Sequence, residues 1–214
     1  MHAAILLDLD DTLLNDRAAM AQGVLKLRKR HGLARQAEDN DVARRWDEEG
    51  RRLWREMAAG RLSFEAQRRA RLRAVFSSEF PDHEADALFS EYLGYYEESW
   101  SLLPGAAEFL ERTAHQRRAL VTNGRLALVE AKLRKCGIAG AFHAVVTPDV
   151  CGASKPDPKV FQYALDALGV MACDAIMIGD NFEADIAPAR ALGMKTLHIQ
   201  YTDGPAPLDA YSAA

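Results

Sequence analysis

Five short apolar segments, separated by helical patterns and turn residues, constrain the fold of this 214-residue chain most strongly. Most of the helical patterns carry Pro or Gly at an end, such as Pro158 near the start and Gly169 at the end of one of them. Short buried strands that alternate with helices are typical of a parallel, doubly wound α/β sheet of the Rossmann type. The expected strands are 4–7, 118–124, 142–148, 174–180 and 195–201. One expected helix, 104–114, precedes the second strand, and three more, 125–137, 157–169 and 183–193, lie between the last four strands.

The block from residue 16 to 99 has a different character. It holds sixteen basic and sixteen acidic side chains, and its apolar residues recur at helical spacing between breakers at Gly32, Gly60 and Pro81. We expect about four helices with an aromatic core. The predicted organisation is therefore an α/β core of residues 1–15 and 100–214, with an all-helical domain of residues 16–99 inserted into it. The tail from Thr202 is expected to be loop.

Composition and charge exclude several classes of protein. The chain is 49% hydrophobic and 27% charged, which is ordinary for a globular protein. A net charge of −4 and a pI of about 5.9 give no reason to expect binding to nucleic acid. No apolar run approaches the roughly 18 residues of a membrane span, and acids stand where a signal peptide would be apolar. We therefore expect a cytoplasmic protein without membrane contact.

The first strand runs directly into acids, in the stretch "AAILLDLDDTLLND". Buried carboxylates without partners are costly, so these side chains are expected to have a purpose. In doubly wound sheets, ligands bind beyond the carboxyl ends of the strands. Polar residues stand at or after the ends of four expected strands: Asp8 and Asp10 at the first, Thr122 and Asn123 at the second, Lys155 in the loop after the third, and Asp180 at the fourth with Asp185 following.

The four acids among these residues indicate a metal ion. Asp8, Asp10, Asp180 and Asp185 would repel one another strongly in a single crevice, and Lys155 alone is too little positive charge to balance them. A hard divalent cation with oxygen ligands removes the conflict, and Mg²⁺ is the expected one. Such a cation also lets an anionic nucleophile approach an anionic phosphate.

The same residues have the chemistry of phosphoryl transfer. The carboxylate of Asp8 is a nucleophile that can form an aspartyl phosphate, and Asp10 can protonate the leaving oxygen and then activate water. Thr122 and Asn123 offer hydrogen bonds to the transferring group, and Lys155 offers a fixed positive charge. The set therefore predicts cleavage of a phosphate ester.

Four motifs made of these residues resemble those of the haloacid dehalogenase (HAD) superfamily. They are "DLDDTL" at 8–13, "LVTNG" at 120–124, "SKPDP" at 154–158 and "IGDNFEAD" at 178–185, in the order of that family. The resemblance covers the whole chain, because the helical block resembles the helical cap of the first type. "TNG" with "GDN" is most similar to phosphatases of the nucleotidase and N-acylneuraminate-9-phosphatase kind.

The resemblance implies a role for each motif residue. Asp8 resembles the nucleophile and a metal ligand, and Asp10 resembles the general acid and base, with a backbone carbonyl that also binds Mg²⁺. Asp180 resembles the remaining metal carboxylate. Thr122 and Lys155 resemble the ligands of the substrate phosphate.

Other residues in and near the motifs have open roles. Asp185 is expected to support Lys155 or a metal-bound water, and Asp11 to shape the turn. Thr12 is expected either to hydrogen-bond within the turn or to contact the substrate. The leaving group could meet the loop around Asn15 or the cap, whose candidates are Arg45, Trp46, Trp54, Arg55 and Arg61.

The sequence thus predicts a Mg²⁺-dependent phosphatase that acts through a phosphorylated Asp8 on a small metabolite, either a sugar phosphate or a nucleoside monophosphate. A monomer or homodimer is expected. A 2-haloacid dehalogenase uses the same nucleophile on carbon, but it expels halide without protonation, so Asp10 argues against it. A phosphomutase of the same fold and a non-catalytic protein that binds phosphorylated ligands are also compatible with these motifs.

Overall fold

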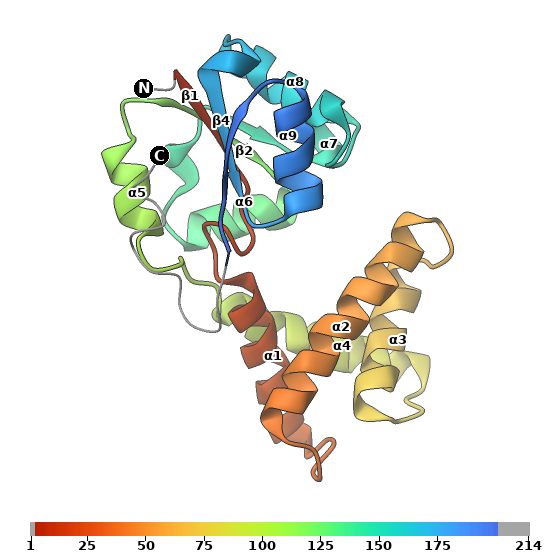
Figure 1. Cartoon of the computed structure of the whole chain (residues 1–214). Coiled ribbons are helices and arrows are strands. Elements are labelled where there is room, and N and C mark those ends of the chain that lie inside the picture. Colours follow the sequence, from red (N-terminus) through yellow and green to blue (C-terminus); the bar gives the residue numbers. More distant parts are fainter. Residues whose placement is uncertain (1–2, 201–214) are drawn as a thin grey trace. The chain divides into compact units, whose positions relative to one another are not determined.

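The computed structural model describes residues 3–200 and divides them into two compact units (Figure 1). One unit comprises the described residues up to Asn15 and from Ser101 onward, and the other runs from Asp16 to Trp100. Tyr201, at the end of the last expected strand, and the tail from Thr202 lie outside the described residues.

A parallel sheet forms the centre of the first unit. Its strand order is β3-β2-β1-β4-β5, and every pair of neighbours is parallel, as expected. Leu7 at the end of β1 aligns with Leu120 of β2 on one side and with Ile178 of β4 on the other, so these strands end together. Over the described residues, the strands are β1 (Ala4–Leu7), β2 (Arg117–Val121), β3 (Ala144–Val146), β4 (Ala175–Gly179) and β5 (Lys195–His198).

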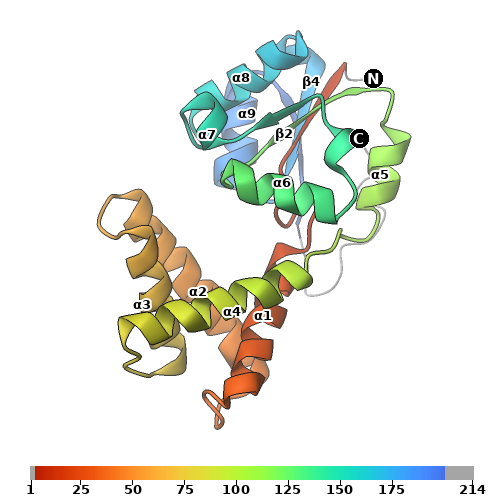
Figure 2. The ribbon, with the colours of Figure 1, turned by 180° about the vertical axis from the view of Figure 1, so that it is seen from behind.

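Helices cover both faces of this sheet (Figures 1 and 2). Side chains of β1 alternate between two cores, with Ile5 and Leu7 in one and Ala4 and Leu6 in the other. The sheet is therefore doubly wound, as predicted. The first core is closed by α5 (Ala106–Arg112) and α6 (Leu126–Lys135), and the second by α7 (Pro148–Cys151), α8 (Pro158–Leu168) and α9 (Ala187–Ala191).

The segment after β4 differs from the single helix expected over 183–193. A π-helix spans Phe182–Ile186, and the short α9 follows it. The side chain of Asn181 accepts hydrogen bonds from two backbone N–H groups of the first turn, and its carbonyl accepts from Ile186 at 3.4 Å. Pro188 has no N–H to extend a regular ladder. The third strand is also shorter than expected, because α7 begins at Pro148.

The second unit is all-helical over residues 16–100, as predicted. Gly32 and Gly60 have positive φ angles at the ends of two helices, and Pro81 directly precedes the last one. These are the residues expected to break the helical pattern. The four helices are α1 (Asp16–His31), α2 (Asp39–Ala58), α3 (Phe64–Phe76) and α4 (Asp82–Glu98).

Aromatic side chains form the core of this helical unit. Trp46 of α2 is fully buried, and the centroid of its ring lies 4.5 Å from the ring centroid of Tyr92 and 5.9 Å from that of Phe89. The guanidinium of Arg71 lies 4.3 Å above the same ring, and its Nε donates to the Trp46 carbonyl at 2.9 Å. Trp54, which the helical spacing assigns to this core, is 46% exposed.

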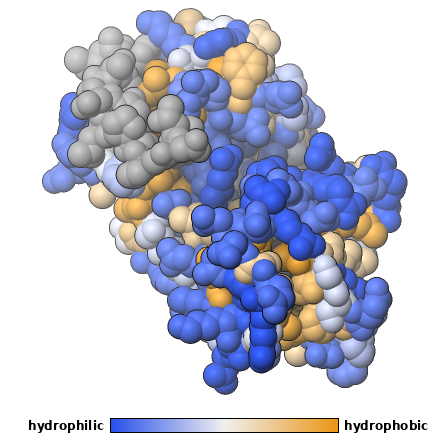
Figure 3. All heavy atoms as spheres, turned by 60° about the horizontal axis from the view of Figure 1, so that its bottom comes forward, coloured by the Kyte–Doolittle hydropathy of each residue, from blue (hydrophilic) through white to orange (hydrophobic). Residues whose placement is uncertain are grey.

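The visible surface in Figure 3 is mainly hydrophilic, in keeping with the many charged side chains of the helices. Among residues 3–200, no helix combines the length and the hydropathy that a membrane crossing requires.

Candidate active site

The polar residues expected at the strand ends all belong to the sheet-containing unit. Asp8 directly follows β1, Thr122 directly follows β2, and Asp180 directly follows β4. Lys155 lies between α7 and α8, in the segment that follows β3. Because β1, β2 and β4 are parallel neighbours, their carboxyl ends present these side chains at one edge of the sheet.

Lys155 joins two of the carboxylates. Its Nζ lies 2.6 Å from an oxygen of Asp8 and 2.6 Å from an oxygen of Asp185, and all three side chains are buried. Burial alone would lower the pKa of Lys155, but the two carboxylates outweigh it and raise that pKa above its usual value. Burial, and secondly the charge of Asp8, raise the pKa of Asp185 to about 6. Asp185 thus makes the contact with Lys155 that one of its two expected roles requires.

Three carboxylates form a cluster suited to a cation. Oxygen atoms of Asp8, Asp180 and Asp185 lie within 4.8 Å of one another. Carboxylate oxygens are the donors that Mg²⁺ prefers, and it is commonly bound through one or two of them with water and a phosphate completing the set. The backbone of Gly179 lies close to the Asp185 carboxyl group, because a Cβ added to Gly179 would stand 2.6 Å from Cγ of Asp185. The residues present thus fit a magnesium ion.

Asp10 is held by a lysine that is absent from the four motifs. Nζ of Lys132 on α6 donates to Oδ1 of Asp10 at 2.6 Å, and Lys132 is 2% exposed. The signal for it is in the sequence, because Lys132 falls three residues after Val129 and next to Leu133, on the buried face of its helix. A lysine at a core position of an amphipathic helix needs a buried partner.

The side chain of Asn123, expected to contact the phosphoryl group, hydrogen-bonds the backbone of Lys155. Its side-chain amide donates to the carbonyl of Lys155 at 3.0 Å and accepts from the Lys155 N–H at 2.7 Å. This reciprocal pair ties the end of β2 to the loop of Lys155. Thr122 is buried beside it, and its hydroxyl accepts from the N–H of Gly124 at 3.1 Å.

The loop after β1 is shaped by its own residues. Asp11 has a φ of 56°, a left-handed conformation that aspartate tolerates in turns, and its N–H donates to the Leu14 carbonyl at 2.7 Å. The hydroxyl of Thr12 donates to Oδ2 of Asp8 at 3.1 Å. Of the two roles considered for Thr12, the structure thus shows the hydrogen bond within the turn.

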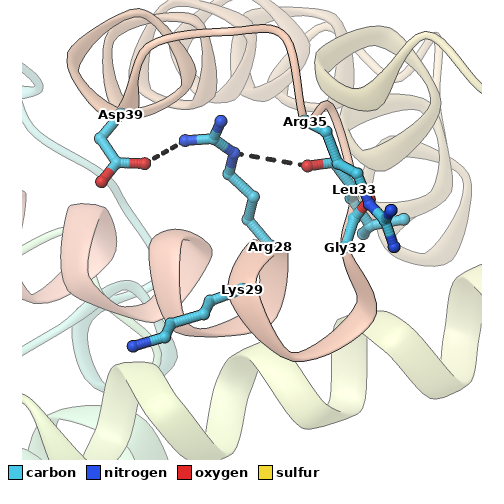
Figure 4. A pocket seen from close by; sticks show the side chains of 6 residues that line it. All are labelled: Arg28, Lys29, Gly32, Leu33, Arg35 and Asp39. Atoms are coloured by element: carbon cyan, nitrogen blue, oxygen red, sulfur yellow. Dashed lines mark hydrogen bonds and ion pairs between the residues drawn. The ribbon is translucent and has the colours of Figure 1, made fainter.

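The helical unit has a separate shallow pocket of about 350 Å³ (Figure 4). Its most buried charge belongs to Arg28, whose guanidinium pairs with Asp39 and donates to the Leu33 carbonyl at 3.3 Å. This arginine holds the loop between α1 and α2. The hydrogen-bond donors of Arg28 contact this loop and Asp39, so fewer of them are available to a ligand in the pocket.

The five cap candidates lie in different settings within the helical unit. Trp46 is buried in the aromatic core, whereas Trp54 is exposed. Arg45 donates to the Ala74 carbonyl at 2.5 Å, and Arg61 pairs with a glutamate at 2.6 Å. Arg55 donates to a backbone carbonyl of its own helix at 3.3 Å.

The comparisons with known proteins agree with this fold. A family model described as haloacid dehalogenase-like hydrolase matches residues 2–193. Ribulose-1,5-bisphosphate 5-phosphatase of Halopiger xanaduensis is 37% identical over 116 residues, which are 53% of this chain and 48% of that protein. Phosphoserine phosphatase of Thermus thermophilus is 38% identical over 120 residues, which are 54% of this chain and 45% of that protein. The chain thus matches about half the length of these curated relatives.

Solved structures extend the similarity of fold to both units. The magnesium-bound HAD-hydrolase YfnB of Bacillus subtilis has a TM-score of 0.77 and 24% identity, over 96% of this chain and 90% of that one. L-2-haloacid dehalogenase of Xanthobacter autotrophicus has a TM-score of 0.72 and 19% identity, over 100% and 88%. The family model covers far more than half of the sequence and the fold agrees with it, so the chain belongs to the haloacid dehalogenase-like hydrolase family.

Proposed function

We propose that this protein is a Mg²⁺-dependent phosphatase that hydrolyses a small phosphate ester through a phosphorylated Asp8. One observation carries the proposal: two carboxyl groups two residues apart are held by different lysines, Asp8 by Lys155 and Asp10 by Lys132. This arrangement separates a nucleophile from an acid, which are the two roles that cleavage of an ester requires. The similarity to two named phosphatases supports it.

In the first step, an oxygen of Asp8 attacks phosphorus and the bond from phosphorus to the leaving oxygen breaks. Asp10 gives its proton to that oxygen, so the product leaves as a neutral alcohol. In the second step, water attacks the phosphorus of the aspartyl phosphate and gives a proton to Asp10. The bond between Asp8 and phosphorus breaks, which releases phosphate and restores both carboxyl groups.

Other residues of the site serve the phosphate. The Thr122 hydroxyl and the Lys155 ammonium lie at the strand ends, where they can bind its oxygens. The Asn123 side chain holds the backbone of Lys155 and thereby fixes the ammonium. Asp8 and Asp180 would hold Mg²⁺ with the Asp10 carbonyl, and the ion would reduce the repulsion between Asp8 and the substrate.

Asp10 also weighs against dehalogenation, although one similar structure is a dehalogenase. Halide is a stable anion that departs without a proton, so an acid at Asp10 and a lysine dedicated to it would have no purpose in that reaction. A phosphomutase differs only in the acceptor, because a sugar hydroxyl then takes the place of water. Release of inorganic phosphate separates these reactions.

The test is the release of inorganic phosphate from a panel of sugar phosphates and nucleoside monophosphates. Activity is expected in MgCl₂ and should be lost in EDTA and in the Asp8→Asn variant. Asp166→Asn, an exposed residue of α8, is the matched control and should keep full activity. Strong phosphate release by Asp8→Asn, or activity that EDTA leaves unchanged, would refute the proposal.

We expect the protein to work as a monomer or homodimer. All residues assigned to the site lie within one unit of one chain. Light scattering during gel filtration should give one or two times 23.7 kDa, and a larger assembly would contradict this expectation.

A further inference from the structure

Lys132 occupies an unusual place on α6. The helix presents Val129 and Leu133 to one of the two cores of the sheet, and Lys132 shares their buried face. Val129 also fills the space beside Gly124, where a Cβ would stand 2.8 Å from its methyl group. At the start of the helix, the N–H of Leu126 donates to an Asp149 carboxylate at 2.7 Å. The helix that carries Lys132 is therefore held at its start and along its buried face.

The buried ammonium would be costly without an anionic partner, because desolvation opposes its charge. Asp10, in the loop after β1 and 122 positions away in the sequence, is such a partner. The Asp10 side chain is 33% exposed, so the pair joins a buried cation to a carboxyl group at the open end of the sheet. If this position served only to fill the core, a leucine or a methionine would fill it without the cost of burying a charge.

The contact restricts the orientation of the Asp10 carboxyl group. Nζ of Lys132 donates to Oδ1, and the buried face of α6 fixes where that nitrogen lies. A carboxyl group held at one oxygen by a buried donor has fewer orientations open to it than one in open solvent.

We propose that Lys132 is a positioning residue, which holds the Asp10 carboxyl group in the orientation that delivers its proton to the leaving oxygen. This inference rests on the proposed phosphatase activity. Lys132 acts through Asp10, whereas Lys155 and Thr12 contact Asp8. Loss of Lys132 should therefore slow the reaction in proportion to how much the leaving group needs a proton.

The test compares two substrates of Lys132→Met, a change that keeps the length of the side chain and removes its charge. The p-nitrophenolate ion leaves readily without a proton, whereas an alkoxide does not. The value of kcat/KM reports steps up to formation of the aspartyl phosphate. We expect it to fall about tenfold further for an alkyl phosphate than for p-nitrophenyl phosphate, a fraction of the effect of a general acid.

Two further variants control this comparison. Lys135→Met changes an exposed lysine in the last turn of the same helix and should leave both values unchanged. Lys132→Arg keeps a cationic donor and should keep the ratio of the two values within about threefold of the wild type, given the size of general acid effects. Equal losses for both substrates in Lys132→Met, or failure of that variant to fold, would overturn the proposal and make Lys132 a purely structural residue.

A crystal structure of Lys132→Met decides the positioning directly. The Asp10 carboxyl group is expected in a different rotamer, and an unchanged rotamer would overturn the inference. A wild-type protein that hydrolyses neither ester would refute the proposed phosphatase instead. In that case the rotamer of Asp10 still shows whether Lys132 holds it.

Discussion

Replacing Lys155 by methionine should reveal the cost of the carboxylates that this lysine neutralises. The Lys155 side chain is 4% exposed, and its Nζ contacts both Asp8 and Asp185 at 2.6 Å. Methionine has a similar length and leaves little empty space, so the change removes charge and two hydrogen bonds with little loss of packing. The two carboxylates then remain buried without this counter-charge.

The expected loss follows from the removal of one partner from a buried ion pair. Such changes lower the free energy of unfolding by about 3–5 kcal/mol, because the remaining charge is neither solvated nor neutralised. Here one ammonium serves two carboxylates, so we expect the upper part of this range at pH 8. The exposed Lys159, four residues further along, should change the same quantity by less than about 0.5 kcal/mol when replaced by methionine.

The assay is urea denaturation in EDTA, so that no divalent cation replaces the missing charge. The free energy of unfolding should also change with pH in a definite direction. Because the pKa of Asp185 is raised to about 6 in the folded protein, ionisation of this carboxyl makes the fold less stable as the pH rises through that value. Lys155 lowers the pKa of Asp185, so its removal raises that pKa further; the deficit of Lys155→Met should therefore be largest at pH 8 and should shrink as the pH falls and Asp185 takes up a proton.

A second substitution separates charge from shape. Adding Asp185→Asn to Lys155→Met removes one of the two carboxylates that lost their partner, so at least about 1 kcal/mol should return at pH 8. A loss below about 1 kcal/mol in Lys155→Met, or a double variant less stable than the single one, would refute the electrostatic reasoning.

Three other predictions test the metal site, the sheet edge and the helical unit. Added MgCl₂ should raise the melting temperature of the wild type, and the rise should be much smaller in Asp180→Asn; an equal rise contradicts a role as ligand. Gly179→Ala should lower the free energy of unfolding by about 1–3 kcal/mol, because its Cβ would overlap Asp185, and an unchanged urea midpoint argues against this close packing. Trp46→Ala should cost about 3–5 kcal/mol in the same measurement and Trp54→Ala much less, and similar losses would contradict the aromatic core.

The positions of the strands can be predicted because the apolar segments are short and are bounded by helical patterns. The sequence places Asp8, Thr122 and Asp180 correctly at the strand ends, since each directly follows its apolar segment. Parallel strands bring such positions together whatever the intervening length, so even the long helical unit inserted after Asn15 does not disturb the prediction. The π-helix after β4 could not be predicted, because it depends on the local contacts of Asn181.

Contacts between loops are harder to predict than positions. The place of Asn123 after a strand predicts that it binds the substrate, which stays a prediction, but it does not reveal that its amide pairs with the backbone of Lys155, 32 residues away. Lys132 does not follow from the strand ends, because this lysine reaches the site from a helix face. Periodicity shows which face of a helix is buried, and a charged residue on that face is the signal that identifies such a lysine.

Lys132 also changes the balance of charge that indicates a metal. Four acids against Lys155 alone is a large excess, and the structure pairs one of them, Asp10, with a second lysine. Oxygens of the other three, Asp8, Asp180 and Asp185, lie close together, and Lys155 contacts two of them. Burial, and secondly the charge of Asp8, raise the pKa of Asp185. This cluster lies where a cation is expected, around the proposed nucleophile, while the proposed acid contacts a lysine of a different helix.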